Sequence, residues 1–327
     1  MNKKIVKICI MIMVFSLISL TLTACGGTQY EQIGETPVPT TQKPDYVILE
    51  DEHIKSYNPL SGKEMAEKET ADKFVAVMID GESEINGLSS PDVIFEGLTD
   101  GTTPDMMWIY ADLSQMTNIG TVGKASHDFV EISSGMGAII VHNGTTSRGE
   151  YAINELEIPT IKVESSTQGS VIKAMLESKG YNKLSTDLSK KPFNVLVGKD
   201  REASGSLSGS CTSVAVYYTE EAYQAFEYNK ETDKYVNEKG LEVDNVIVMY
   251  CDFEAFDGGQ DWVLSSGEGL WISNGTGEQI NWEKNGANNP LLFSSKKTGE
   301  KLVVNEGKTF ICIVPTANRT LTEITTK

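Results

Sequence analysis

Short apolar runs alternate with amphipathic segments along the first half of the chain. Continuous apolar runs at residues 74–79, 106–110 and 138–141 predict strands that are buried on both faces, and residues 161–163 predict a further brief strand. Strands that alternate with helical segments indicate a parallel or mixed sheet with helices packed against it.

Two of the intervening segments have the apolar spacing of helices. In residues 125–134 the apolar positions share one face, Asp128 points away from that face, and Gly135 ends the helix. A second helix is expected to bury the face that contains Val171 and to end at Gly180. Both helices are therefore predicted to cover a sheet with one side and to present polar side chains to solvent on the other.

The pattern changes to short strands after the Gly- and Ser-rich residues 201–210. Turn signals such as residues 274–277 separate these strands, which is typical of antiparallel sheets. We therefore predict an α+β protein, with an N-terminal α/β domain containing a mixed sheet over residues 58–203 and a C-terminal, largely antiparallel β-rich domain over residues 211–327. The candidate strands of the second domain are residues 213–218, 225–228, 234–237, 243–250, 261–265, 270–273, 279–282, 302–304 and 309–314.

Residues 1–24 have the pattern of a secretory signal. Lys3, Lys4 and Lys7 precede an apolar run over residues 8–22, which is short for a membrane span but has the length of a signal-peptide core. The run ends in Leu-Thr-Ala before Cys25, a pattern that a lipoprotein signal peptidase cleaves. Cys25 is therefore the predicted site of lipid attachment.

Residues 25–57 are predicted to be a flexible, lipid-anchored tether. They are rich in Gly, Thr, Gln, Glu and Pro and have no helical periodicity. Such a tether reaches about 30 Å at about 5–6 Å times the square root of its residue number, and two or more acyl chains hold a protein firmly on a bilayer. The sequence thus predicts a protein bound to the cell membrane through its lipid anchor, on the extracytoplasmic side.

The excess of acidic residues argues against one class of partner, the nucleic acids. The chain has 28 Lys and Arg against 46 Asp and Glu. Residues 1–24 contain three Lys and no acidic residue, so their removal leaves 25 basic and 46 acidic residues, a net charge of −21. A chain this acidic is not expected to bind nucleic acid through its overall charge.

The cysteine and histidine pattern predicts neither a metal nor another cofactor. Cys211, Cys251 and Cys312 remain beyond the lipobox, and an odd number leaves at least one thiol unpaired. Cys251 and Cys312 lie in apolar, strand-like runs, which favours buried thiols and leaves a bridge between them open. The chain has no His or Cys spacing typical of a metal site, and the acidic residues 252–261 lack the EF-hand pattern, so a solvated loop is expected there.

Several short motifs follow one another in a characteristic order. Residues 58–62 read NPLSG, 87–96 read GLSSPDVIFE, 141–144 read VHNG, 243–248 read VDNVIV and 269–272 read GLWI. In order and spacing these motifs resemble those of the YerB-like lipoproteins, which carry a two-part domain of unknown function. The resemblance extends over nearly the whole chain after the predicted tether. It implies a two-domain extracytoplasmic lipoprotein and no established reaction.

The chain also departs from the family pattern. Gly123 and Ser126 stand in the stretch where the family has arginines, and Phe193 stands where it has a histidine. Arginine and histidine are the side chains that hold anions and move protons, so their loss argues against catalysis. His142 follows a predicted strand, where ligands commonly bind in α/β sheets. The residues predicted to line a ligand cleft are Asp92, Glu96, His142, Asn143 and Asn194.

These observations leave three hypotheses for function, none with an assigned catalytic residue. The first is a non-catalytic protein that binds a cell-envelope component or a protein partner. The second is a hydrolase or transferase that acts on cell-wall material, with Glu96 and His142 as acid and base. The third is solute capture for a transporter, against which the chain shows no pair of similar α/β lobes.

Overall fold

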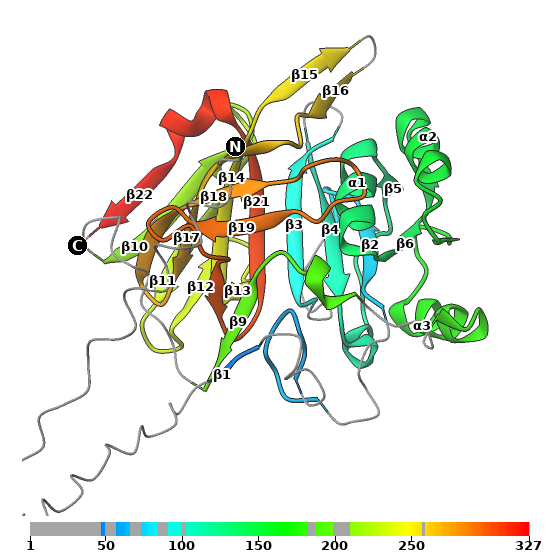
Figure 1. The fold of residues 1–327 in the computed structure, drawn as a ribbon, viewed down its shortest axis with the longest axis horizontal. Coiled ribbons are helices and arrows are strands. Elements are labelled where there is room, and N and C mark those ends of the chain that lie inside the picture. Colours follow the sequence, from blue (N-terminus) through cyan, green and yellow to red (C-terminus); the bar gives the residue numbers. More distant parts are fainter. Residues whose placement is uncertain are drawn as a thin grey trace, which may run out of the picture. The chain divides into compact units, whose positions relative to one another are not determined.

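The structure is a computed structural model (Figure 1). Contacts between Cα atoms divide the chain into residues 1–43 and a compact unit of residues 44–327, to which all described residues belong. The predicted signal peptide, Cys25 and most of the predicted tether lie outside the described residues. In the described part, no helix is long and apolar enough to cross a membrane. The structure describes residues 47–49, 57–65, 73–83, 91–99, 103–181, 187–198, 210–256 and 259–326.

A mixed, ten-stranded sheet runs through the described chain in the order β19-β18-β17-β14-β21-β3-β4-β2-β6-β8. Its central strands are continuous apolar runs that are buried along their length, as expected for a sheet covered on both faces. The strands are β2 (Val75–Ile79), β3 (Val93–Leu98), β4 (Pro104–Tyr110), β6 (Ile139–His142), β8 (Thr160–Lys162), β14 (Asn245–Cys251), β17 (Ser266–Ser273), β18 (Thr276–Glu283), β19 (Leu292–Ser295) and β21 (Thr309–Pro315).

Strand β21 connects the two halves of this sheet. It pairs in parallel with β14 on one side and with β3 on the other, so that Phe310 lies opposite both Val246 and Ile94. The two predicted domains therefore contribute strands to one sheet. Their predicted boundary, at residues 203–211, falls almost entirely outside the described residues.

Alternate side chains of the sheet pack against two separate layers. On the face of Phe95, which we call the α1 face, lie α1 (His127–Met136), α2 (Ser147–Glu155) and a sheet of β1 (Val47–Ile48), β9 (Asn194–Val197) and β20 (Val303–Asn305). On the face of Ile94, the α3 face, lie α3 (Gly169–Ser178) and a five-stranded sheet. In Figure 1 the helices lie beside β2 and β6, at the opposite end of the large sheet from β17 and β18.

The remaining elements are shorter or lie on the periphery. The five-stranded sheet consists of β10 (Cys211–Tyr217), β11 (Tyr223–Asn229), β12 (Lys234–Asn237), β13 (Glu242–Val243) and β22 (Glu323–Thr326). Two small ladders are β5 (Lys124–Ala125) with β7 (Gly144–Thr145), and the hairpin β15 (Phe253–Phe256) with β16 (Gly259–Trp262). The 3-10 helices among the described residues are η2 (Leu113–Gln115), η4 (Leu188–Lys190) and η5 (Thr316–Leu321).

The predicted α+β class is confirmed, and so are the strands that apolar runs predicted. Residues 74–79, 106–110 and 138–141 correspond to β2, β4 and β6, and residues 234–237 are β12. Several strands were not predicted, because polar residues or glycine interrupt their apolar pattern and pairing with neighbours holds them extended. Among these strands are β3, β9, β15, β19 and β22, and β15 lies in the expected acidic loop.

Two predicted helices differ in detail from the structure. Helix α1 continues through Gly135 to Met136 and ends at Gly137, whose φ of 65° is left-handed. A Cβ at Gly135 would collide with the carbonyl oxygen of Asn289, so this glycine permits close packing rather than ending the helix. In α3 the buried residues include Ile172, whereas Val171 is 50% exposed, so the predicted face was wrong.

The start of the folded unit and the cysteines also differ from expectation. Residues 47 and 48, predicted to be tether, form β1, which pairs antiparallel with β9, and Leu49 is buried in the core of the α1 face. Cys251 and Cys312 lie on adjacent strands but in the cores of opposite faces, which leaves no geometry for a bridge. Both thiols are free and buried, like that of Cys211.

The placement of α3 makes a testable prediction. Replacing Ile172, which is fully buried, by alanine should lower the free energy of unfolding by about 2–5 kcal/mol, since it leaves a cavity. The matched change Val171→Ala removes exposed apolar atoms and should alter it by no more than about 0.5 kcal/mol. Urea unfolding followed by circular dichroism measures both, and equal losses would contradict this orientation of α3.

Candidate functional site

The predicted ligand cleft does not form, because its two main residues lie on opposite faces of the large sheet. Glu96 follows Phe95 on β3 and shares the α3 face with Ile94, whereas His142 shares the α1 face with Ile140. Strands β4 and β2 also separate β3 from β6, which places the two strands about 14 Å apart at about 4.8 Å per step. Because successive side chains of a strand point to opposite faces of the sheet, Glu96 and His142 do not meet.

Glu96 is a buried carboxyl group between the two sheets of the α3 face. Its Oε2 accepts a hydrogen bond of 2.6 Å from the hydroxyl of Tyr218 and one of 3.1 Å from Nε2 of Gln224. Burial raises the pKa of Glu96, because removal from water penalises its charged form more than these donors stabilise it. This arrangement fastens β10 and β11 to β3 and leaves Glu96 covered by protein.

Asp92 has a structural role at the start of β3. Its Oδ1 accepts from Nδ2 of Asn58 at 2.9 Å, and its Oδ2 accepts from the backbone N–H of Ala111 at 2.7 Å. Burial raises its pKa as well. The carboxyl group therefore joins the NPLSG segment to the end of β4.

The three remaining residues of the predicted cleft are His142, Asn143 and Asn194. Nδ1 of His142 lies 2.7 Å from the carbonyl oxygen of Gly144, and burial lowers the pKa of this imidazole. The backbone N–H of Asn143 donates to the carbonyl of Gly123, and Asn194 begins β9 in the small sheet of the α1 face.

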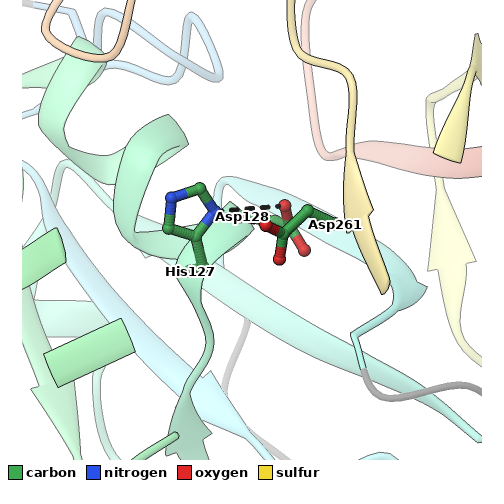
Figure 2. Close-up of side chains that lie close together, drawn as sticks. All are labelled: His127, Asp128 and Asp261. Atoms are coloured by element: carbon green, nitrogen blue, oxygen red, sulfur yellow. Dashed lines mark ion pairs between the residues drawn. The ribbon is translucent and has the colours of Figure 1, made fainter. Parts of the chain in front are cut away.

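A cluster that the sequence did not predict lies where α1 begins (Figure 2). His127 and Asp128 belong to the first turn of α1, and Asp261 comes from β16. Nδ1 of His127 lies 3.6 Å from Oδ1 of Asp128 and 3.8 Å from Oδ2 of Asp261. The ligand-type atoms of the three residues all lie within 4.8 Å of one another. We call these residues the His127 cluster.

Hairpin β15–β16 holds Asp261 in this place. The backbone N–H of Trp262 donates to Oδ1 of Asp128 at 2.9 Å, and its indole N–H donates to the carbonyl of Leu98 at 2.6 Å. The Trp262 ring also packs edge-on against Phe129 at 5.2 Å between centroids. Asp128, predicted to point to solvent, is instead 2% exposed in its side chain, and burial raises its pKa.

The outer side of the cluster is charged. Nε of Arg148 donates to Oδ1 of Asp261 at 3.1 Å, and its Nη2 contacts Oδ2 of the same carboxylate. The guanidinium also stacks on Phe256, 4.4 Å from the ring centroid. On the helix, Oε1 of Glu131 lies 3.5 Å from Nε2 of His127. No short sequence motif predicts this cluster, because β16 follows α1 by more than one hundred residues.

A separate polar hollow of about 620 Å³ opens beside the α3 face. It lies past the carboxyl ends of β2 and β8, which run parallel with β6 between them. The Ser83 hydroxyl accepts from the N–H of Thr121 at 3.0 Å, and the N–H of Val122 donates to the carbonyl of Ser165, so backbone contacts hold its wall. The hollow is lined by Asp80, Glu82, Ser83, Ile119, Gly120, Thr121, Ser165, Ser166 and Gln168.

Comparison with known proteins places the chain in a family. Residues 60–196 match the family model described as protein of unknown function (DUF3048) N-terminal domain, and residues 210–311 match that of its C-terminal domain. The chain belongs to the DUF3048 family. The predicted YerB-like resemblance is thereby confirmed. No curated protein matches this DUF3048 chain.

A solved structure shows the same fold. The crystal structure of YerB protein from Bacillus subtilis superposes with a TM-score of 0.65 and 22% identity, over 82% of this chain and 99% of that one. At this identity the likeness concerns the fold alone. The DUF3048 fold thus includes both matched parts, while the activity of its members is unassigned.

The buried state of Glu96 predicts how stability depends on pH. Because its pKa is raised in the folded protein, the unfolded chain loses this proton first, at about pH 4.3, and the free energy of unfolding falls as pH rises from there to the folded pKa. Glu96→Gln keeps an acceptor for Tyr218 and should remove this part of the decline. Urea titrations of both proteins from pH 4 to pH 8 measure the difference.

The comparison has a matched control in Glu164→Gln, which removes an exposed carboxylate. It should follow the pH dependence of the unchanged protein. If Glu96→Gln and the unchanged protein lost stability in parallel over this range, Glu96 would not be the buried acid described above.

Proposed function

We propose that this DUF3048 protein is a lipid-anchored binding protein on the extracytoplasmic side of the cell membrane, and that it holds a hydroxyl- and amine-bearing component of the cell envelope in the polar hollow. The observation that carries this proposal is the hollow itself. Its volume of about 620 Å³ is within the range of about 300–1,000 Å³ usual for small-molecule sites.

The lining of the hollow supports a particular ligand chemistry. Asp80 and Glu82 bring carboxylates, and Ser83, Thr121, Ser165 and Ser166 bring hydroxyl groups. Among the lining residues there is no Lys or Arg, so phosphate-rich polymers would meet negative charge without a compensating cation. Carboxylates accept hydrogen bonds from sugar hydroxyls and pair with amines. Amino-sugar units of a wall glycan combine both groups where their N-acetyl group has been removed.

The position of the hollow in the fold also supports binding. In open α/β sheets, ligands bind beyond the carboxyl ends of the strands. Asp80 follows β2 directly, and Ser165 follows β8 by three residues. A site whose wall is held by backbone hydrogen bonds is formed before the ligand arrives, which reduces the entropy lost on binding.

The alternative of a wall hydrolase or transferase that uses Glu96 and His142 receives no support from their geometry. General acid–base catalysis requires both groups within hydrogen-bond reach of one substrate, directly or through one water molecule. The two side chains lie on opposite faces of the sheet, and each is engaged with protein atoms.

Ligand binding in the hollow is tested by thermal shift of the full chain in detergent. A tetramer of glucosamine at millimolar concentration should raise the melting temperature, and the neutral N-acetylated tetramer should raise it less, because it lacks the amine charges. Glu82→Gln should weaken the effect at least about fivefold in half-saturating concentration, the loss of one charged hydrogen bond.

Two controls make the result specific to the hollow. Glu164→Gln removes a neighbouring exposed carboxylate that is not part of the lining, and it should leave the shift unchanged. Polyphosphate should produce no shift. A shift that both substitutions reduce equally, or no shift with either sugar, would overturn the assignment of this hollow.

Membrane anchoring is tested separately at Cys25. Cys25→Ser removes the thiol that receives the lipid, so the protein should move from the membrane fraction of cells to the medium or the soluble envelope fraction. Metabolic labelling with an alkyne fatty acid should mark the unchanged protein and not the variant. Cys211→Ser, at a buried thiol, is the matched control and should remain labelled and membrane-bound.

A further inference from the structure

The spacing within the His127 cluster is too long for hydrogen bonds and suits the ligands of one ion. Protein N–H···O bonds are about 2.9–3.0 Å long, whereas Nδ1 of His127 is 3.6 Å from Asp128 and 3.8 Å from Asp261. Consider two ligand atoms that each lie about 2.0–2.2 Å from the same cation. They are about 3.3–4.2 Å apart when the angle between them at the cation is tetrahedral or wider. The two separations from Nδ1 of His127 fall within that range, and the oxygens of Asp128 and Asp261 lie within 4.8 Å of each other.

The imidazole itself indicates a missing partner. Nδ1 of His127 is buried and has no hydrogen-bond partner within the described chain, although the ring is 22% exposed in total. This nitrogen faces the two carboxylates, while Nε2, on the opposite side of the ring, faces Glu131 at 3.5 Å. A histidine whose Nε2–H is turned toward a carboxylate presents the lone pair of Nδ1 to a metal.

The other two candidate ligands also have outer partners. Oδ1 of Asp128 accepts the N–H of Trp262, and Oδ1 of Asp261 accepts Nε of Arg148. Metal ligands are usually held by hydrogen bonds of this kind, which fix their orientation before the ion arrives. Nη2 of Arg148 contacts Oδ2 of Asp261 and has to leave that oxygen when an ion takes it. The guanidinium is 47% exposed and can keep the hydrogen bond from its Nε to Oδ1.

The local charge favours a cation. Around the His127 cluster, Asp128, Asp261 and Glu131 contribute three carboxylates, and Arg148 contributes one guanidinium. The Lys284 ammonium adds a second positive charge, which faces Glu131. With these groups ionised the net charge is −1, and a bound cation would lower the repulsion among the carboxylates.

We propose that His127, Asp128 and Asp261 bind one divalent transition-metal ion, with Zn²⁺ as the best match, and that this ion fastens the hairpin β15–β16 to α1. An imidazole nitrogen together with carboxylate oxygens suits Zn²⁺ better than Ca²⁺ or Mg²⁺, which prefer oxygen ligands alone. Three protein ligands leave a position for water. The site is distinct from the polar hollow, which shares no residue with it.

Zinc binding is measured on the full chain in detergent, purified without a histidine tag and stripped with EDTA. Isothermal titration with ZnCl₂ should give one ion per chain. His127→Ala and Asp261→Asn, both at partly exposed side chains, should each weaken binding at least about 100-fold, and Glu131→Gln about 10-fold. Glu155→Gln removes an exposed carboxylate at the end of α2, about 10 Å along the helix from Arg148, and should bind as the unchanged protein does.

Two further readouts separate a metal site from a structural salt-bridge cluster. Co²⁺ in place of Zn²⁺ should give visible absorption that is lost in His127→Ala. Hydrogen exchange of the amides in β15 and β16 should slow with Zn²⁺ in the unchanged protein and not in Asp261→Asn. Circular dichroism of each metal-free variant checks that it is folded.

Each outcome decides part of the proposal. One zinc ion per chain, lost in both ligand variants and retained in Glu155→Gln, supports the site. No stoichiometric binding, or binding that His127→Ala leaves intact, overturns it. Zinc binding without slower exchange in the hairpin overturns the fastening role.

Discussion

The parallel pairing of β21 with β3 is the interaction on which the rest of the structure depends. These strands come from opposite halves of the sequence, and each is buried along most of its length. Their pairing closes a chain of more than two hundred residues, so it costs loop-closure entropy that burial on two faces must offset. Through this pair, the strands β14, β17, β18 and β19 extend the same sheet that β2, β4, β6 and β8 form on the other side.

The two faces of that sheet determine which polar groups can meet. The α1 face carries His142 and, through α1 and the hairpin, the His127 cluster, while the α3 face carries Glu96. Because side chains alternate along a strand, groups on opposite faces are separated by the thickness of the sheet itself. Because of this constraint, the predicted cleft between Glu96 and His142 does not form. For the same reason Glu96 has a structural role in the packing of the two sheets. The five-stranded sheet covers Glu96 on the α3 face, and Tyr218 and Gln224 donate hydrogen bonds to its carboxyl group.

The two sites that the structure does offer are built in different ways. The hollow is assembled within the first half of the chain, from residues 80–168, where Asp80 continues from β2 and its N–H donates to the carbonyl of Thr121. The His127 cluster depends instead on a long-range contact, in which Trp262 anchors a hairpin from the second half of the chain onto α1. The two proposed activities, binding of an envelope component and binding of a cation, therefore rest on separate parts of the fold.

What the sequence determined by itself was local. Continuous apolar runs identified β2, β4 and β21, the change of pattern after residue 210 indicated a β-rich second half, and ordered motifs indicated the YerB-like family. These signals follow from a strand or helix burying its own side chains, which is a property of neighbouring residues. What only the tertiary structure decided was which elements lie beside one another. The order of strands in the sheet placed Glu96 and His142 apart, the packing of α3 buried Ile172 rather than Val171, and the docking of the hairpin buried Asp128 beside His127. Each of these depends on contacts between residues far apart in the chain, and no spacing within a single segment encodes them.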